Sequence, residues 1–187
     1  MINSAGAVLL LAACASTPTP SPLGRSGDPG PSTPEVAAGT VTEGDITLAV
    51  TAEPVAVPAG QPISVEAVLT HDNPEPLVIS GSGTGIVSFG VTRLEDGLTS
   101  GGAAMTSDCA RHLLPAGEPL VVPFSKSGGY SAGDPNAEFM EIYFSDPELT
   151  LPAGTWRIDV TTHGTLGEGC TGPQLGLELS VMVTVSE

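Results

Sequence analysis

Ser131 lies in the segment Gly129-Tyr130-Ser131-Ala132-Gly133, the local pattern in this chain that most directly suggests covalent chemistry. A G-x-S-x-G pattern can hold a nucleophilic serine at a sharp turn between a strand and a helix, beside N–H groups that bind an oxyanion. The flanking residues show neither a strong strand before the motif nor a helix after it. We therefore expect a mobile loop here and keep a hydrolase using Ser131 as the alternative.

Five carboxylates follow this segment within fifteen residues: Asp134, Glu138, Glu141, Asp146 and Glu148. Carboxylates in a loop can bind Ca²⁺, and a pair of them can act as general acid and base. Their spacing is not that of an EF-hand. We expect a solvated acidic edge, which also deters strand edges from pairing. Ca²⁺ binding by the 134–148 loop and a hydrolase using an acidic pair in it are the alternatives.

The elements that would position these residues follow an apolar run over residues 5–13, which ends in the sequence L-A-A-C at Cys14. An apolar run closed by small residues is typical of a secretory signal. It is shorter than the roughly 20 apolar residues that a membrane-spanning helix needs. Residues 1–4 carry no Lys or Arg, whereas an export signal usually begins with basic residues. The competing interpretations are a plain signal peptide and a short apolar tail without processing.

The cysteine at the end of this run resembles the lipobox of bacterial lipoproteins. In that family the signal is cleaved before the cysteine, whose thiol is acylated, for example with palmitate. The resemblance implies a signal peptide over residues 1–13, a lipidated Cys14, and a location on the outer face of the cell membrane. A single Lys beside abundant Ala, Gly, Pro and Val indicates a GC-rich genome and fits an actinobacterium.

The sequence then divides into a tether and one domain. Residues 14–40 are rich in Ser, Thr and Pro and almost lack large apolar residues, so they cannot bury enough surface to offset their ordering entropy. The Thr-Pro and Ser-Pro repeats favour extended polyproline geometry. The remaining residues, 41–187, are numerous enough for one domain with a real core.

With Cys14 taken by lipid, two cysteines are left, Cys109 and Cys170. Outside the cytoplasm such a pair is most often a disulfide, so we expect Cα atoms about 5–6 Å apart. The competing interpretation is a metal site formed by both cysteines and His112, although the histidines lack a ligand-like spacing. The predicted domain therefore carries a disulfide and no metal or other cofactor.

Alternating aliphatic residues predict the strands. From residue 175 to residue 185 every odd position is aliphatic, and a period of two over this length gives one buried and one solvated face. No segment keeps helical spacing over three turns, so no helix is predicted. The same alternation, or a shorter apolar run, occurs at residues 46–50, 63–69, 77–79, 87–91, 120–124, 140–144 and 156–160.

About eight short strands between Gly/Pro turns predict an all-β fold, a two-sheet antiparallel sandwich. The lead L-P-A-G-T-W-R-I at residues 151–158 and the closing strand at residues 177–185 are similar to the last two strands of immunoglobulin-like domains in bacterial envelope proteins. In such a core we expect Trp156 to be buried with Ile158 and Val160, and Arg157 and Asp159 to face outward.

The charge excludes one class of partner. The chain has 21 acidic against 5 basic residues, a net charge of −16, and nucleic-acid binding needs clustered cations. The sequence predicts a membrane-anchored, extracytoplasmic lipoprotein whose immunoglobulin-like sandwich is a non-catalytic binding or envelope-interaction module. Its partners would be the membrane, through the lipid on Cys14, and an envelope protein or glycan. The alternative is the cell-envelope hydrolase described above; a metal carrier and a protease inhibitor are the lesser alternatives.

Overall fold

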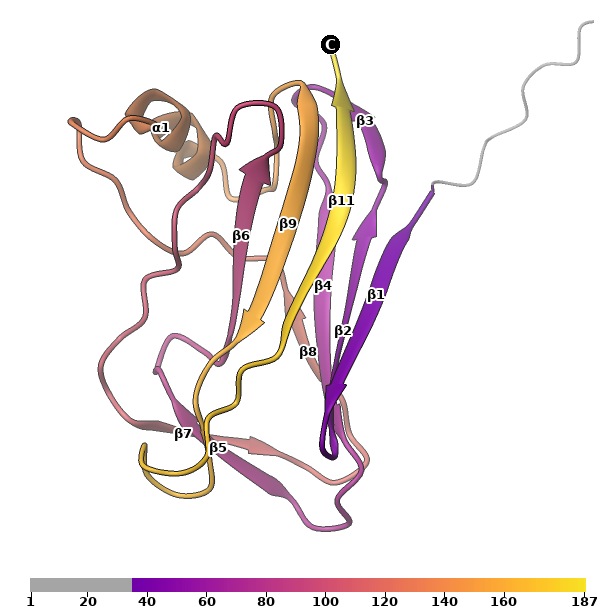
Figure 1. Cartoon of the computed structure of the whole chain (residues 1–187), viewed down its shortest axis with the longest axis vertical. Helices are drawn as coiled ribbons and strands as arrows, with labels where there is room; N and C mark the ends of the chain where they lie inside the picture. Colours follow the sequence, from indigo (N-terminus) through magenta and orange to yellow (C-terminus); the bar gives the residue numbers. More distant parts are fainter. Residues whose placement is uncertain (1–34) are drawn as a thin grey trace, which may run out of the picture. The chain divides into compact units, whose positions relative to one another are not determined.

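Two four-stranded sheets face each other in the computed structural model, which describes residues 35–187 (Figure 1). One sheet has the strand order β1-β2-β4-β8 and the other β3-β11-β9-β6. A third, small sheet, β10-β5-β7, lies at one end. The elements are β1 (Ala37–Glu43), β2 (Ile46–Glu53), β3 (Ala56–Pro58), β4 (Ser64–His71), β5 (Leu77–Gly81), β6 (Val87–Arg93), β7 (Ala110–Leu114), β8 (Leu120–Pro123), α1 (Ala137–Ser145), β9 (Gly154–Thr162), β10 (Thr165–Leu166) and β11 (Glu178–Ser186).

This architecture confirms the predicted all-β sandwich of antiparallel sheets. The pairing is antiparallel throughout except where β3 lies parallel to β11. The described residues form eleven strands rather than about eight, because the sequence pattern did not reveal β1, β3, β7 or β10. Within residues 35–187, no helix has the length and apolar character needed to cross a membrane.

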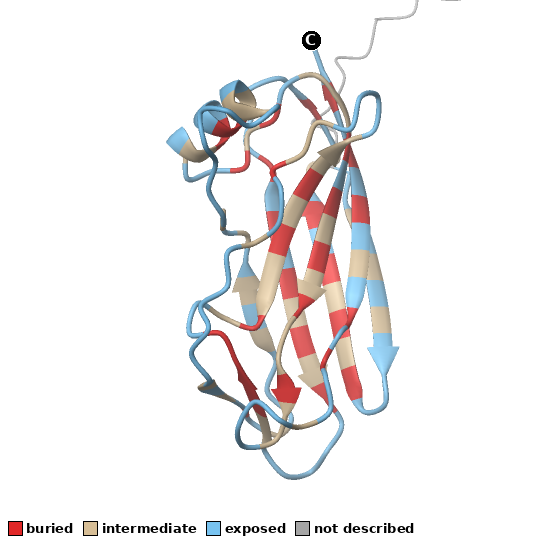
Figure 2. Ribbon diagram, turned by 60° about the vertical axis from the view of Figure 1, so that its left-hand side comes forward, coloured by how far each residue is buried: buried red, intermediate tan, exposed pale blue. Residues whose placement is uncertain are grey.

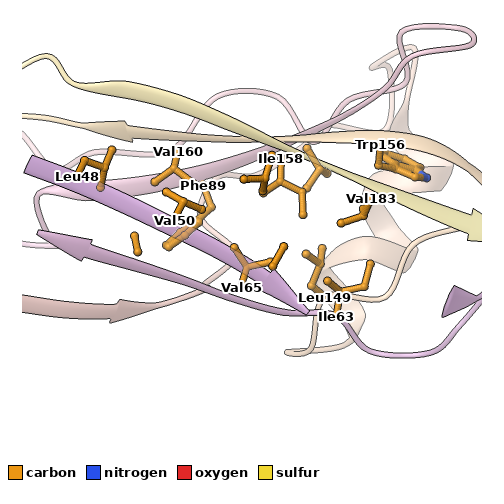
Figure 3. Close-up of a cluster of buried hydrophobic side chains, with 14 of the residues drawn as sticks. Leu48, Val50, Ile63, Val65, Phe89, Leu149, Trp156, Ile158, Val160 and Val183 are labelled. Atoms are coloured by element: carbon orange, nitrogen blue, oxygen red, sulfur yellow. The ribbon is translucent and has the colours of Figure 1, made fainter. Parts of the chain in front are cut away.

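The core lies between the two large sheets, and the strands show alternating buried and exposed bands (Figure 2). Leu48, Val50 and Val65 point from one sheet toward Ile158 and Val160 of the other (Figure 3). All of these side chains are at most 3 % exposed. The period of two read from the sequence therefore marks the buried face correctly.

Trp156 is fully buried, as predicted, on the same face of β9 as Ile158 and Val160. Its indole N–H donates a hydrogen bond to the Pro152 carbonyl at 2.8 Å, which satisfies its one polar group. Arg157 lies on the outer face and is exposed. The register of β9 is therefore the one that the sequence pattern indicated.

The first strand begins inside the segment that was predicted as tether. Residues 37–40 belong to β1, which pairs along its full length with β2. Small residues fit here because a Cβ on Gly39 would come 3.1 Å from the Leu179 side chain of β11. The tether was predicted from the scarcity of large apolar residues. This strand does not need them, because backbone pairing with β2 stabilises it. The predicted signal peptide, Cys14 and the rest of the tether lie outside the described residues.

The predicted strand over residues 140–144 is wrong, because this segment lies in helix α1. Met140 and Tyr143 are three residues apart, point the same way and are buried. Ile142, which a strand would have placed beside Met140, is instead 66 % exposed. The helix has nine residues, too few to show helical spacing over three turns, so the absence of a predicted helix is also corrected.

Candidate functional site

The predicted disulfide is present. Cys109 and Cys170 are bonded, with Cα atoms 5.9 Å apart. Cys109 immediately precedes β7, and Cys170 lies in the loop that follows β10. Because both sulfurs are in the disulfide, neither is free to act as a thiolate ligand in the metal site that included His112. Within residues 35–187, no three His, Cys, Asp or Glu side chains are placed to hold a metal ion.

Ser131 lies in a loop and is exposed, and its backbone N–H donates to the Asp134 carboxylate at 2.7 Å. A serine nucleophile needs a neighbouring base that can take its proton. Among residues 35–187, the hydrogen-bond partners of the three histidines are other groups: His71 Nε2 contacts the carbonyls of Leu114 and Pro115, His112 Nε2 the carbonyl of Ser82, and His163 Nε2 the hydroxyl of Ser88. The structure therefore does not join Ser131 to a histidine.

The Ser88–His163 contact is one that sequence reasoning missed. The Ser88 Oγ and His163 Nε2 atoms are 2.6 Å apart, beside a hollow of about 390 Å³ along β6. Burial lowers the pKa of His163, and the Glu178 carboxylate acts in the opposite direction. A neutral imidazole can accept a hydroxyl proton, but a catalytic base is also oriented by a third group. No carboxylate in residues 35–187 hydrogen-bonds to His163, so this pair lacks that group.

The acidic 134–148 segment is the most distinctive surface of the domain. It is not a continuous loop, since α1 occupies its centre. Ile142 lies beside a groove of about 240 Å³ between the helix and residues 150–152. We define the α1 surface as this groove together with the acidic residues of the same segment: Gly60, Phe139, Ile142, Tyr143, Thr150, Leu151 and Pro152, with Glu138, Glu141, Asp146 and Glu148. Glu148 lines a separate hollow beside Ile63 and not the groove itself.

Aromatic packing holds α1 in place over one end of the sandwich (Figure 1). Phe139 stacks on Trp156 with ring centroids 5.5 Å apart, and Tyr143 packs against Phe139 at the same distance. Burial raises the pKa of Tyr143 to about 12, so its hydroxyl stays neutral at physiological pH. The inward face of the helix is thus tied to the core, which leaves Ile142 on the outward face.

The α1 surface is strongly acidic. Its carboxylates Glu138, Glu141 and Glu148 are exposed, and the last turn of the helix contains no basic residue. Lys126 is the nearby cation, but its ammonium donates to the carbonyls of Tyr143 and Asp146 at 2.5 and 2.7 Å. That contact satisfies carbonyls at the helix C-terminus and complements its negative dipole. Lys126 is therefore directed at the backbone carbonyls, and the Asp146 carboxylate is the acidic group that acts on its charge.

Comparisons with known proteins add no family to this description: no protein-family model matches the chain, and no curated protein matches it. The fold and surface together define a β-sandwich domain with an exposed apolar side chain on a short helix, in a segment that also carries exposed carboxylates.

Proposed function

We propose that this protein is a membrane-anchored, extracytoplasmic lipoprotein that displays its immunoglobulin-like sandwich as a non-catalytic binding module. The anchor is the lipid on Cys14, and the location is the outer face of the cell membrane. The α1 surface is the part of the domain that binds. Its partner is a cationic segment of an envelope protein that carries at least one apolar side chain.

The observation that carries this proposal is the exposure of Ile142. Ile142, which is 66 % exposed, continues the apolar lining of the groove, and a continuous exposed apolar patch marks an interaction site. Met140 and Tyr143, on the same helix, are buried and form its inward face. Ile142 is apolar as well but lies on the outward face. Leaving Ile142 outside favours contact with a partner over packing in the core.

Charge complementarity indicates which kind of partner binds the α1 surface. A segment that places an apolar side chain against Ile142 also meets the helix that carries Glu138 and Glu141, which are exposed. Glu148, which is exposed too, follows the helix in the same segment, and the Lys126 ammonium donates to backbone carbonyls. Like charges placed against such a surface cost several kcal/mol, whereas Lys or Arg on the partner speeds association and fixes its orientation. A protein segment is favoured over a glycan because the groove is lined mainly by apolar side chains.

Site-specific photo-crosslinking in intact cells tests the binding surface. A benzophenone side chain at position 142 should capture one envelope protein through a segment rich in Lys or Arg, identified by mass spectrometry. The matched control is position 182 on β11, where Met182 is also an exposed apolar residue, at 41 %. The same products from both positions, or a crosslink only to a second copy of this chain, would contradict the proposed surface.

Fractionation of cells that express Cys14→Ser tests the anchor. The variant should leave the membrane fraction, because firm anchoring needs the acyl chains, at about 0.8 kcal/mol per buried CH₂. The acidic domain has no attraction to anionic lipid headgroups that could replace them. Retention of the variant in membranes washed with high salt would show that the lipid on Cys14 is not the anchor.

A further inference from the structure

A second candidate site lies at the end of the sandwich opposite to α1, where the β1–β2 turn comes near the small sheet (Figure 1). A pocket of about 510 Å³ opens there, within the size range of small-ligand sites. Its walls include Ile46, Leu77 and Leu175, from three different segments of the chain. We infer that this pocket binds a small organic cation, a primary ammonium that carries an apolar group.

His71, which lines the pocket and is 6 % exposed, has an unsatisfied acceptor. Its Nε2 lies 3.1 and 3.2 Å from the carbonyls of Leu114 and Pro115. Because carbonyls only accept, Nε2 carries a proton, and in the tautomer with its only ring proton there Nδ1 is an acceptor. Nδ1 is buried without a hydrogen-bond partner among residues 35–187, in a side chain that lines the pocket. A ligand N–H would supply that partner once the side chains covering Nδ1 move aside.

The rim of the pocket is negatively charged. Glu43 and Asp45 line the pocket from the β1–β2 turn, and both are exposed. No Lys, Arg or other histidine contributes to the lining. The ionisable groups at the mouth are therefore carboxylates, which attract a cation and repel an organic anion. Below the rim the walls include Ile46, Leu77, Leu166 and Leu175, which favour a cation that carries an apolar group over a bare, strongly hydrated ion.

One wall of the pocket is held by hydrogen bonds and a disulfide in the absence of a ligand. Leu166 and Leu175 are on the two arms of a loop held by the hydrogen bonds Leu166 N–H to Pro173 O and Leu175 N–H to Gly164 O. The same loop contains Cys170, whose disulfide ties it to the residue before β7. A pre-formed pocket loses less ordering entropy on binding than a mobile one. This inference is independent of the binding proposed for the α1 surface.

Two-dimensional NMR of the folded domain with its disulfide intact tests the inference. Phenethylammonium should shift the amides of Asp45, Ile46 and Leu175 saturably, with a Kd on the order of 1 mM, as expected for so small a ligand. The His71 Nδ1 resonance should move with them. Hydrocinnamate, which has a similar shape and the opposite charge, should leave these amides unshifted.

A pair of matched double variants separates the carboxylates of the rim from net charge. Glu43→Gln/Asp45→Asn should weaken phenethylammonium binding about three- to tenfold. Asp72→Asn/Glu75→Gln removes the same charge from the neighbouring loop, outside the lining, and should change Kd less than twofold. All four side chains are exposed, so we expect both double variants to fold. Equal binding by the two double variants, or hydrocinnamate shifts as large as those of the cation, would overturn the inference.

Discussion

The two ends of this sandwich are stabilised in different ways. At the α1 end, the segment 137–151 buries Met140, Tyr143, Leu149 and Leu151 against the core. At the opposite end, the disulfide joins the segments 101–109 and 167–174, in which no residue is buried. A covalent bond joins segments that bury no side chain, and packing holds the segment that buries several. Because these four buried side chains hold the segment in place, the α1 end does not need Ile142 in its core.

Removing Trp156 should break the packed end and have the largest effect. Trp156→Ala takes away a fully buried ring that contacts Phe139 and satisfies the Pro152 carbonyl. We expect the free energy of unfolding to fall by about 3–5 kcal/mol, as in other large-to-small core substitutions. Denaturant midpoints measure this. Asp159→Asn on the outer face is the control and should change stability by less than about 0.5 kcal/mol; a neutral Trp156→Ala would refute the packing described for α1.

Removing the disulfide should break the opposite end and have the next largest effect. Cys109→Ser/Cys170→Ser frees a loop with a sequence separation of 61 residues. On the chain-entropy account this costs at most about 4 kcal/mol, through the unfolded state. The Tm should fall, while the near-ultraviolet circular dichroism of Trp156 stays native because the packed end is untouched. Loss of that signal in the folded variant would show that the two ends are not stabilised separately.

Lys126→Met should loosen α1 without disturbing the core. The substitution keeps an apolar stem but removes the ammonium that donates to the carbonyls of Tyr143 and Asp146. Charge at a helix C-terminus contributes about 0.3–1 kcal/mol, so we expect a loss in that range. Hydrogen exchange should speed up in α1 and remain unchanged in β9. Unchanged exchange in the helix would mean that Lys126 does not stabilise it.

The smallest effect concerns the pH dependence of an ion pair near Trp156. Arg93 donates to Asp96 and, with the Leu98 N–H, lowers the pKa of Asp96 from 3.8 to about 2. Because the folded pKa is below the ordinary value, the stabilisation is complete above about pH 4 and is lost as pH falls through about 2. Carboxyl carbon NMR should give a titration midpoint near 2. A midpoint near 3.8 would show that Arg93 does not hold this carboxylate.

The sequence predicted those parts of the fold in which one side of a strand is buried. Period-two runs in β2, β4, β6, β9 and β11 mark their inner faces directly, because burial against the other sheet selects aliphatic residues. It could not predict β1, whose small residues are held by backbone pairing, or α1, whose inward face rests on two buried residues.

The candidate sites depend on tertiary contacts, which a local pattern does not contain. The chain has three cysteines, and the disulfide was predictable once Cys14 was assigned to the lipobox, because the other two allow only one pairing. The Ser88–His163 contact requires the register between β6 and β9, and the pocket at His71 requires three distant segments to meet. The acidic character of residues 134–148 was visible, but the exposure of Ile142 followed only once that segment was known to be helical.

The most direct test of the α1 surface is the crosslinking yield from position 142 in intact cells when the surrounding charge is reversed. Glu141→Lys/Glu148→Lys should lower the yield of the envelope-protein product about tenfold or more, because like charges would then face each other. The control, Glu75→Lys/Glu118→Lys, makes the same change in net charge at exposed positions outside the α1 surface and should leave the yield unchanged. Equal yields from the two double variants would contradict a cationic partner at the α1 surface.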